Sequence, residues 1–241
     1  MSLLKIPFLV ASAIGVRISL TTSSPPPSSE EKLKPNMLES YFSSAGMMIF
    51  SLELLKFSAY TTLSAEAANI IAMHVDPSKV PGGIYGRQAV QLLRSLHSTP
   101  ITPTFLACNL AIVIGGMLRF YCMSTLGKFW SFQLSVRKEH KLVTSGPYSV
   151  VRHPSYTGSL LQSVGIIVMY GSPGSWMWQS GILQVPFMTA VVVIGCLMHT
   201  LGIWGSISRP AIEDKIMQRA MGEEWENWAE KVKYRLLPGV Y

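Results

Sequence analysis

Long apolar runs separated by short polar segments are the feature that most constrains this chain. One membrane crossing takes roughly 20 apolar residues, and runs near that length occur at residues 3–20, about 104–123, about 154–170 and about 176–206. Another helical region, about 37–75, is too long for one crossing. We therefore expect an all-α integral membrane protein, a multi-span helical bundle with about five transmembrane helices in one structural domain.

The composition agrees with a surface that faces lipid. Hydrophobic residues make up 49% of the chain and charged residues 14%, whereas soluble domains carry about a quarter charged residues. The net charge of +7 comes mainly from Lys and Arg between and after the apolar runs, which is typical of cytoplasmic flanks. No nucleic-acid motif accompanies this charge, so binding to nucleic acid is not expected. Cys108, Cys122 and Cys196 have the spacing of neither a disulfide framework nor a metal site.

The N-terminal half contains several polar residues among its apolar runs. The first run begins near Lys5 and resembles a secretory signal, but a polar, Pro-rich linker follows it, so we interpret it as a membrane helix. Glu53 and Lys56 share a helical face and are predicted to neutralise each other inside the bundle, with a polar lining for substrate entry as the alternative. The mixed segment 84–98 is predicted to be an interfacial helix.

The order of the runs predicts a topology. The turn sequence GSPGS after Tyr170 makes the last two spans an antiparallel hairpin, which puts the basic segment before them on the same side as the C-terminal tail. Both are rich in Lys and Arg and are therefore predicted to be cytosolic, with the chain's start luminal. Lys79, Arg87 and Arg94 then fall on the luminal side, against the rule, and an extra half-crossing would remove this conflict.

The segment 127–158 is too polar to span a membrane. Gly146 and Pro147 predict a turn, and Pro154 predicts the start of the next helix directly after His153. The unpaired N–H groups at such a helix start suit an anionic group, such as the carboxylate of an amino-acid-like ligand.

The tail after residue 207 is a second unusual stretch. Pro210 suits a helix start, and Glu213 and Asp214 would then lie in the first turn, where negative charge is favoured. The residues predicted to form one apolar face are Ile212, Ile216, Met217, Ala220 and Met221. The residues predicted to anchor the tail at the membrane surface are Trp225, Trp228 and Tyr234. Taken alone, the tail also fits an ordinary interfacial amphipathic helix.

Together, the sequences HKLVTSGPY, RHPSYTG, ED, GEEW and KVKYRLLPG closely resemble the isoprenylcysteine carboxyl methyltransferase family. The resemblance covers residues 127–241, which would form a methyltransferase core, with 1–126 as N-terminal membrane helices and connecting segments of the same structural domain. It implies methyl transfer from S-adenosylmethionine to the C-terminal carboxylate of a prenylated cysteine, farnesylated or geranylgeranylated. It also implies a multi-pass protein of the endoplasmic reticulum membrane, with its pocket formed by the segment before the fourth span and the tail, facing the cytosol.

The resemblance also implies individual roles. The cofactor-binding positions fall on Gln133, His140, Lys141, Leu142, Val143, Tyr148, His153, Pro154, Ser155, Tyr156 and Glu213, and Arg209 would orient the substrate carboxylate. No metal is expected. Asp214, Met221 and Lys233 depart from the family pattern, and Asp214 leaves the reach of the acidic pair open.

These residue types suit the implied reaction. A carboxylate is already ionised at neutral pH, so it can attack a sulfonium methyl group without a general base. Tyr148 and Tyr156 would face the sulfonium or the adenine, and Glu213 would accept hydrogen bonds from the ribose or the amino group. His153 is assigned to binding the cofactor carboxylate or adenine, while His74, His97 and His199 receive no role.

Three alternatives remain open. Membrane methyltransferases that act on lipid amines, and membrane sterol reductases, share a similar C-terminal core and the Arg-His-Pro-x-Tyr element. The combination of Arg209, Glu213, GEEW and the KVKYRLLPG end favours the prenylcysteine branch. A channel or scaffold would explain the apolar runs but would leave the HKLV and RHPSY segments without a purpose.

Overall fold

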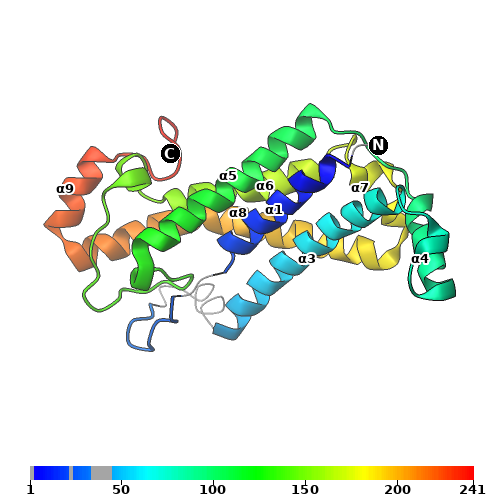
Figure 1. Ribbon diagram of the computed structural model, residues 1–241. Helices are drawn as coiled ribbons and strands as arrows, with labels where there is room; N and C mark the ends of the chain where they lie inside the picture. Colours follow the sequence, from blue (N-terminus) through cyan, green and yellow to red (C-terminus); the bar gives the residue numbers. More distant parts are fainter. Residues whose placement is uncertain (1–2, 22–23, 34–44) are drawn as a thin grey trace.

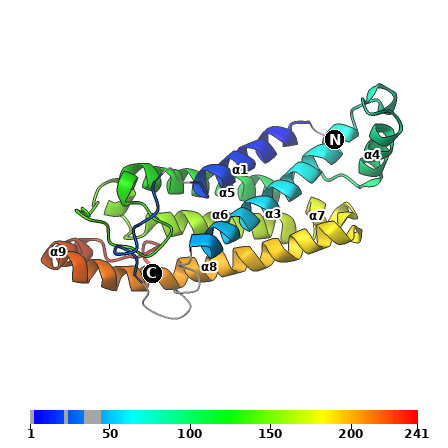
Figure 2. The same cartoon turned by 90° about the horizontal axis from the view of Figure 1, so that it is seen from below.

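The computed structural model describes residues 3–21, 24–33 and 45–241. Within these ranges the chain is helical, with one isolated bridge between Lys32 and Ser135 and no β-strand. The long helices, which run side by side along the length of the molecule (Figures 1 and 2), are α1 (Lys5–Ser19), α3 (Ala45–Ala72), α5 (Pro103–Leu126), α6 (Pro154–Gly171) and α8 (Pro186–Met221). The predicted all-α class is confirmed, whereas the part of the predicted region 37–75 before residue 45 lies outside the described residues.

Successive long helices run in opposite directions, so each end of the molecule collects its own connections (Figure 1). One end holds the start of the chain, α4 (Gly83–Ser95), α7 (Trp176–Gln179) and the 3₁₀ turns at Pro77–Lys79 and Ile182–Gln184. The other end holds the segment 127–153, with 3₁₀ turns at Gly127–Phe129 and Gly146–Ser149, and α9 (Glu223–Lys231) with the C-terminal tail. The basic segment and the tail therefore lie at the same end, as the predicted antiparallel hairpin requires.

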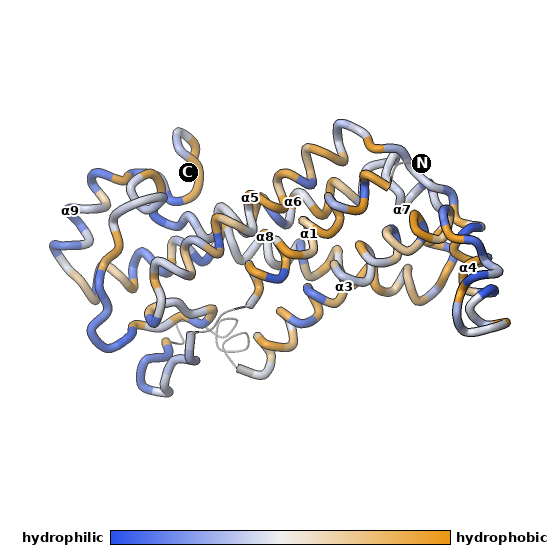
Figure 3. The backbone as a smooth tube through the Cα atoms, viewed as in Figure 1, coloured by the Kyte–Doolittle hydropathy of each residue, from blue (hydrophilic) through white to orange (hydrophobic). Residues whose placement is uncertain are grey.

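The middle of the helices is apolar and both ends are polar (Figure 3). Two stretches within the described ranges, Pro103–Phe129 and Pro186–Met221, are long and apolar enough to cross a membrane by length and composition. Along α8, exposed apolar side chains recur at Val193, Leu197, Leu201 and Trp204, which is unfavourable in water and favourable in lipid. These features indicate a membrane protein, and the number of spans stays a prediction.

Glycines allow α5 to pack closely against two neighbours. A Cβ added at Gly115 would lie 2.5 Å from the carbonyl oxygen of Gly158 on α6, and one added at Gly116 would lie 2.5 Å from that of Gly15 on α1. Such contacts exclude any side chain at these positions. Small residues let membrane helices approach to the distance at which backbone atoms touch, which is a main source of packing energy in lipid.

Charged residues at three places in the N-terminal half differ from expectation. Lys5 is buried rather than flanking, because its Nζ lies 2.5 Å from Glu66 Oε1 across the α1–α3 contact. Lys56 and Glu53 do pair, as predicted, but the Glu53 side chain is 60% exposed, so the pair is not interior. Arg94 donates to the carbonyls of Ala72 and Val75 and thereby caps the end of α3. This contact gives Arg94 a structural reason to lie far from the basic end, with no extra half-crossing in the described residues.

The predicted helix start at Pro210 is wrong, because α8 continues through Pro210 to Met221. Proline inside a helix removes one backbone hydrogen bond and costs about 3 kcal/mol. Here Pro210 is buried, and the residues after it are held by tertiary contacts that offset this cost. Glu213 and Asp214 consequently lie in the late turns of a long helix rather than in the first turn of a new one.

Candidate functional site

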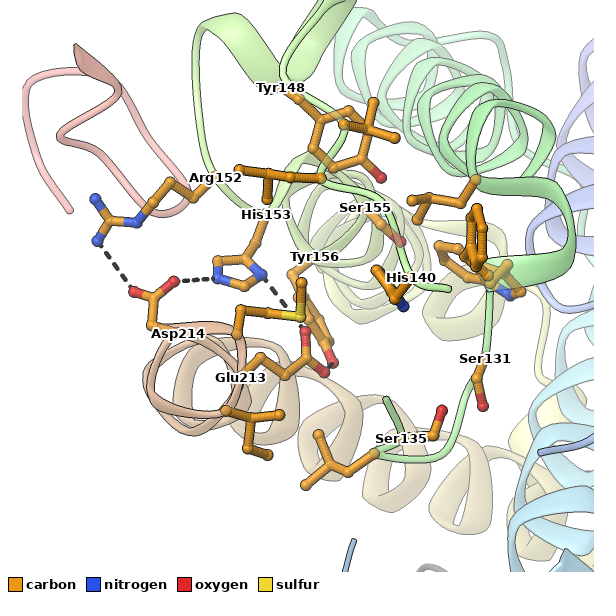
Figure 4. A pocket seen from close by; sticks show the side chains of 18 of the residues that line it. Ser131, Ser135, His140, Tyr148, Arg152, His153, Ser155, Tyr156, Glu213 and Asp214 are labelled. Atoms are coloured by element: carbon orange, nitrogen blue, oxygen red, sulfur yellow. Dashed lines mark hydrogen bonds and ion pairs between the residues drawn. The ribbon is translucent and has the colours of Figure 1, made fainter. Parts of the chain in front are cut away.

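A cavity of about 200 Å³ lies at the basic end of the bundle. Its walls come from the end of α5, the segment 127–153, the start of α6, the late turns of α8, and α9. Figure 4 shows the polar side chains that face one another across it, with His153 and Tyr156 on one side and Glu213 and Asp214 on the other. Two stretches that are far apart in the sequence therefore form one site.

The structure places every sequence-predicted site residue on this cavity. The lining residues that were predicted are Gln133, His140, Lys141, Leu142, Val143, Tyr148, His153, Pro154, Ser155, Tyr156, Arg209 and Glu213. Pro154 is the first residue of α6, which matches the predicted helix start. Their shared location is an observation, while their roles toward a ligand stay predictions.

Glu213 lies at the centre of the polar contacts. Its carboxylate accepts a hydrogen bond from the Tyr156 hydroxyl. Its Oε2 lies 3.5 Å from His153 Nδ1, and its Oε1 lies 3.8 Å from an Arg209 nitrogen one helical turn earlier. A carboxylate held from three sides keeps one orientation and can present an acceptor to a ligand in the cavity.

His153 contacts both acidic residues of α8. Its Nε2 lies 2.8 Å from Asp214 Oδ1, and its Nδ1 faces Glu213. Burial lowers the pKa of His153, but the hydrogen bonds and charges of Asp214 and Glu213 outweigh burial and leave that pKa above its usual value. The start of α6, where an anionic ligand group was expected, already has these two carboxylates beside it. A ligand carboxylate is therefore disfavoured there, and a ligand amine or hydroxyl is favoured.

Asp214 ties the tail to the site. Its Oδ2 accepts from Arg152 at 3.0 Å and from Arg235 at 2.8 Å. The backbone N–H of His153 also donates to the Arg235 carbonyl at 2.8 Å. Asp214 thus reaches Arg152, His153 and Arg235 within the protein, while the reach of the acidic pair toward a ligand stays a prediction.

Two arginines approach the cavity from different helices. Arg209 on α8 donates to the Phe132 carbonyl at 3.1 Å. Arg119 on α5, which the sequence reasoning missed, is buried and donates to the carbonyls of Ser19 and Ser155, with the Phe132 ring 5.8 Å away. Among the described residues, no carboxylate pairs with Arg119. A buried cation without an ionic partner favours a bound anion.

Aromatic rings form much of the remaining wall. Trp225 and Trp228, predicted as membrane anchors, line the cavity instead: the Trp225 ring faces Arg152, and Trp228 Nε1 donates to the Tyr148 carbonyl at 3.2 Å. Trp130 also lines the cavity and was missed, since an isolated Trp gives no pattern to detect. Such rings suit flat heterocycles and cationic groups.

Several uncharged polar atoms on the cavity wall make no hydrogen bond within the described residues. Trp130 Nε1 and His140 Nδ1 are buried and have no hydrogen-bond partner within the described part of the chain. Burial, followed by the charge of Arg137, lowers the pKa of His140, so its ring is neutral at pH 7. Burial also raises the pKa of Tyr148, which keeps its hydroxyl protonated. Unpaired buried polar atoms are costly, so their presence on a cavity wall indicates a polar ligand.

The fold and the site together define a helical membrane protein with a polar, aromatic-walled pocket at one end of its bundle. Residues 106–192 match the isoprenylcysteine carboxyl methyltransferase (ICMT) family. The comparison thus confirms the resemblance carried by the motifs. The match begins within α5, earlier than expected, and ends within α8 before Arg209 and Glu213.

Similar proteins include two plant methyltransferases and a fungal reductase. "Protein-S-isoprenylcysteine O-methyltransferase B" of Arabidopsis thaliana is 44% identical over 64 residues, which cover 26% of this chain and 32% of that protein. "Probable protein-S-isoprenylcysteine O-methyltransferase" of Oryza sativa subsp. indica is 28% identical over 124 residues, covering 50% of this chain and 54% of that protein. "Delta(14)-sterol reductase" of Gibberella zeae is 25% identical over 124 residues, covering 45% of this chain and 26% of that protein. The matched part of the chain thus spans about half or less of the length of these relatives.

Proposed function

We propose that this chain transfers a methyl group from S-adenosylmethionine to the C-terminal carboxylate of a prenylated cysteine, giving a methyl ester. The observation that carries the proposal is that all the residues that the family resemblance assigned to cofactor and substrate line the same pocket. The names of the plant relatives support the same reaction.

The pocket suits S-adenosylmethionine on its chemistry. The cofactor is flat and hydrogen-bonding at its adenine, cationic at its sulfur, and zwitterionic at its amino-acid end. Trp130 Nε1 and His140 Nδ1 offer unpaired buried polar atoms to the adenine or ribose, and Tyr148 offers a protonated hydroxyl. Glu213 offers a negative acceptor to the ribose hydroxyls or the amino group, and so attracts the positive parts of the molecule.

His153 takes a different role from the one expected of it. Both of its ring nitrogens face carboxylates, so it holds Glu213 and Asp214 in place and stabilises their charges. In this proposal His153 is a positioning residue, and its ring does not need to touch the cofactor. No proton has to be moved, because the attacking carboxylate is already ionised at neutral pH.

Arg209 and Arg119 are proposed to receive the substrate carboxylate. Both lie on the cavity, and Arg209 stands one turn before Glu213, so a single face of α8 presents one residue to each ligand. When bound, the cofactor supplies an electrophilic methyl group on its sulfonium. The protein's task is then alignment of nucleophile and methyl, which contributes roughly 7–11 kcal/mol in well-oriented reactions. The aromatic residues on the cavity wall would help to exclude water from the bound carboxylate.

The proposal also includes how the helices cross the membrane and which side the pocket faces. The long helices would all cross the bilayer, about five spans in total, and the basic pocket end would face the cytosol in the endoplasmic reticulum membrane. A farnesyl or geranylgeranyl chain is apolar enough to stay in lipid while the cysteine carboxylate reaches the headgroup level. A pocket at the end of the bundle suits such a substrate.

The fungal reductase among the relatives makes a nicotinamide-dependent enzyme the main rival. Calorimetric titration of the purified chain in detergent separates the two. S-adenosylhomocysteine should bind with an affinity that falls at least tenfold in Glu213→Gln, because a hydrogen bond to a charged group contributes about 1.5–3 kcal/mol. Tight binding of NADPH without binding of S-adenosylhomocysteine would reject the proposal. A methyltransferase that acts on lipid amines would bind the same cofactor. It differs in the molecule that receives the methyl group, an amine lipid in place of a prenylcysteine.

A further inference from the structure

A second cavity, of about 150 Å³, lies among the helices away from the pocket just described. Its walls come from α1, α3, α6, α7 and α8, and it shares no lining residue with the first pocket. Because α7 and Leu183 line it, it lies toward the end of the molecule opposite Glu213. We call it the bundle cavity. The proposed methyl transfer uses none of its residues.

The wall of the bundle cavity is mostly apolar, with Val16, Leu63, Ile166, Met177 and Val191 among its lining. Trp178 and Cys196 are exposed lining residues and mark the side that opens outward. At this level of the bundle the outward side faces lipid rather than water, because the neighbouring exposed residues of α8 are apolar. A molecule entering this cavity therefore comes laterally from the bilayer.

Two polar atoms on this apolar wall lack partners. Ser12 on α1 is fully buried, and its hydroxyl has no hydrogen-bond partner among the residues that the structure describes. His199 on α8 is 6% exposed; its Nδ1 contacts Ser163 Oγ at 3.4 Å, while its Nε2 is buried and finds no partner in residues 3–21, 24–33 and 45–241. Buried polar groups in native proteins are nearly always hydrogen-bonded, and more strictly so in lipid, where no water is present. The two atoms therefore favour a ligand that places a polar group inside this apolar cavity.

The chemistry of the cavity selects the ligand class. Its apolar wall and its opening toward lipid suit an aliphatic chain, and its two buried polar atoms suit a polar group on that chain. The acyl tail of a phospholipid ends in a methyl group and would leave Ser12 and His199 unpaired. We propose that the bundle cavity binds the hydroxyl end of a linear lipid alcohol, with Ser12 and His199 as its hydrogen-bond partners. A hydroxyl both donates and accepts, so it can pair with either tautomer of the imidazole.

The test uses photolabelling of the full chain in detergent with a linear aliphatic alcohol that carries a diazirine in its chain. Peptide mapping should place saturable labelling on lining residues such as Met177 and Val191. Dodecanol should compete at a concentration at least tenfold lower than dodecane, because only the alcohol supplies the hydroxyl. Ser12→Ala and His199→Phe should each raise the half-saturating probe concentration several-fold.

Ser19→Ala is the matched control, since Ser19 is a buried serine of the same helix that bonds to Val16 and Gln162 and does not line the cavity. It should leave labelling unchanged. Ser12→Ala removes an unpaired hydroxyl and so should not unfold the protein, which thermal melting in the same detergent verifies. Labelling spread over all lipid-facing helices, equal competition by dodecane and dodecanol, or unchanged half-saturation in Ser12→Ala would each overturn the proposal. Methyl transfer is not measured, so the proposed function stands or falls separately.

Discussion

His153 Nε2 lies 2.8 Å from Asp214 Oδ1, an ion pair that joins the start of α6 to the late turns of α8. The same Asp214 holds Arg152 and Arg235, so one carboxylate fastens the two halves of the site and the C-terminal tail. The contact connects RHPSY with the acidic pair of the tail, which are the two stretches that carried the family resemblance.

The first prediction concerns the pH dependence of stability. Because the pKa of His153 is raised above its ordinary value of 6.5, protonated His153 stabilises the folded state fully below about pH 6.5. This contribution is lost as the pH rises through the folded-state pKa. The melting temperature of the wild type should therefore fall between pH 6 and pH 9, by more than that of His153→Gln. Parallel melting curves of the two proteins would contradict the assignment.

The second prediction separates the two acidic residues of α8. Both line the cavity, but Asp214 also binds Arg235 of the tail, so Glu213→Gln should weaken binding of S-adenosylhomocysteine and lower the melting temperature less than Asp214→Asn does. Asp214→Asn should instead destabilise the protein by about 3 kcal/mol, because removing one partner leaves buried charges uncompensated. Circular dichroism melting and calorimetry on both variants measure the two effects. The same pattern in both variants would count against distinct roles.

The third prediction concerns the contact between α5 and α6. An alanine at Gly115 would place its Cβ 2.5 Å from a backbone oxygen of Gly158, so Gly115→Ala must separate the helices. We expect a loss of about 1–3 kcal/mol or more, as in other overpacked sites. Gly205→Ala is the matched control: Gly205 lies in α8, and an added Cβ would meet no described residue beyond the local backbone of its own helix within 4 Å. The control should keep or slightly raise the melting temperature, and equal losses in both would remove the packing argument.

The fourth prediction concerns Arg209. If Arg209 orients the substrate carboxylate, Arg209→Ala should lose methyl transfer and keep its affinity for S-adenosylhomocysteine. Arg209→Lys should recover only part of the activity, since an ammonium lacks the planar fork of the guanidinium. If Arg209 only anchors α8 to anionic headgroups, Lys should serve as well. Steady-state kinetics in one detergent decide between these outcomes, and wild-type turnover and KM in the Lys variant would contradict the orienting role.

Local patterns in the sequence predicted much of the fold. The apolar runs predicted α1, α5 and α6 to within a few residues, because burial in lipid requires continuous apolar length. Pro210 misled the prediction, since a proline signal is local whereas the contacts that hold α8 together are tertiary.

The contacts that the sequence did not predict are mainly those between residues far apart in the chain. The buried pair of Lys5 with Glu66 joins residues on different helices, and no local pattern reveals it. The site residues were found through motifs, which record spatial relationships that propensities do not. Arg119 was missed because a single Arg in an apolar run reads as an interfacial residue until the neighbouring helices are in place.

The most direct test of the central claim is a transfer assay with the purified chain in detergent. It uses methyl-labelled S-adenosylmethionine and N-acetyl-S-farnesylcysteine, and it counts label released as methanol by mild base. The account predicts base-labile label that depends on the prenylcysteine and falls strongly in Arg209→Ala. No base-labile label from a folded protein that binds S-adenosylhomocysteine, or label transferred only to an amine lipid, would contradict it.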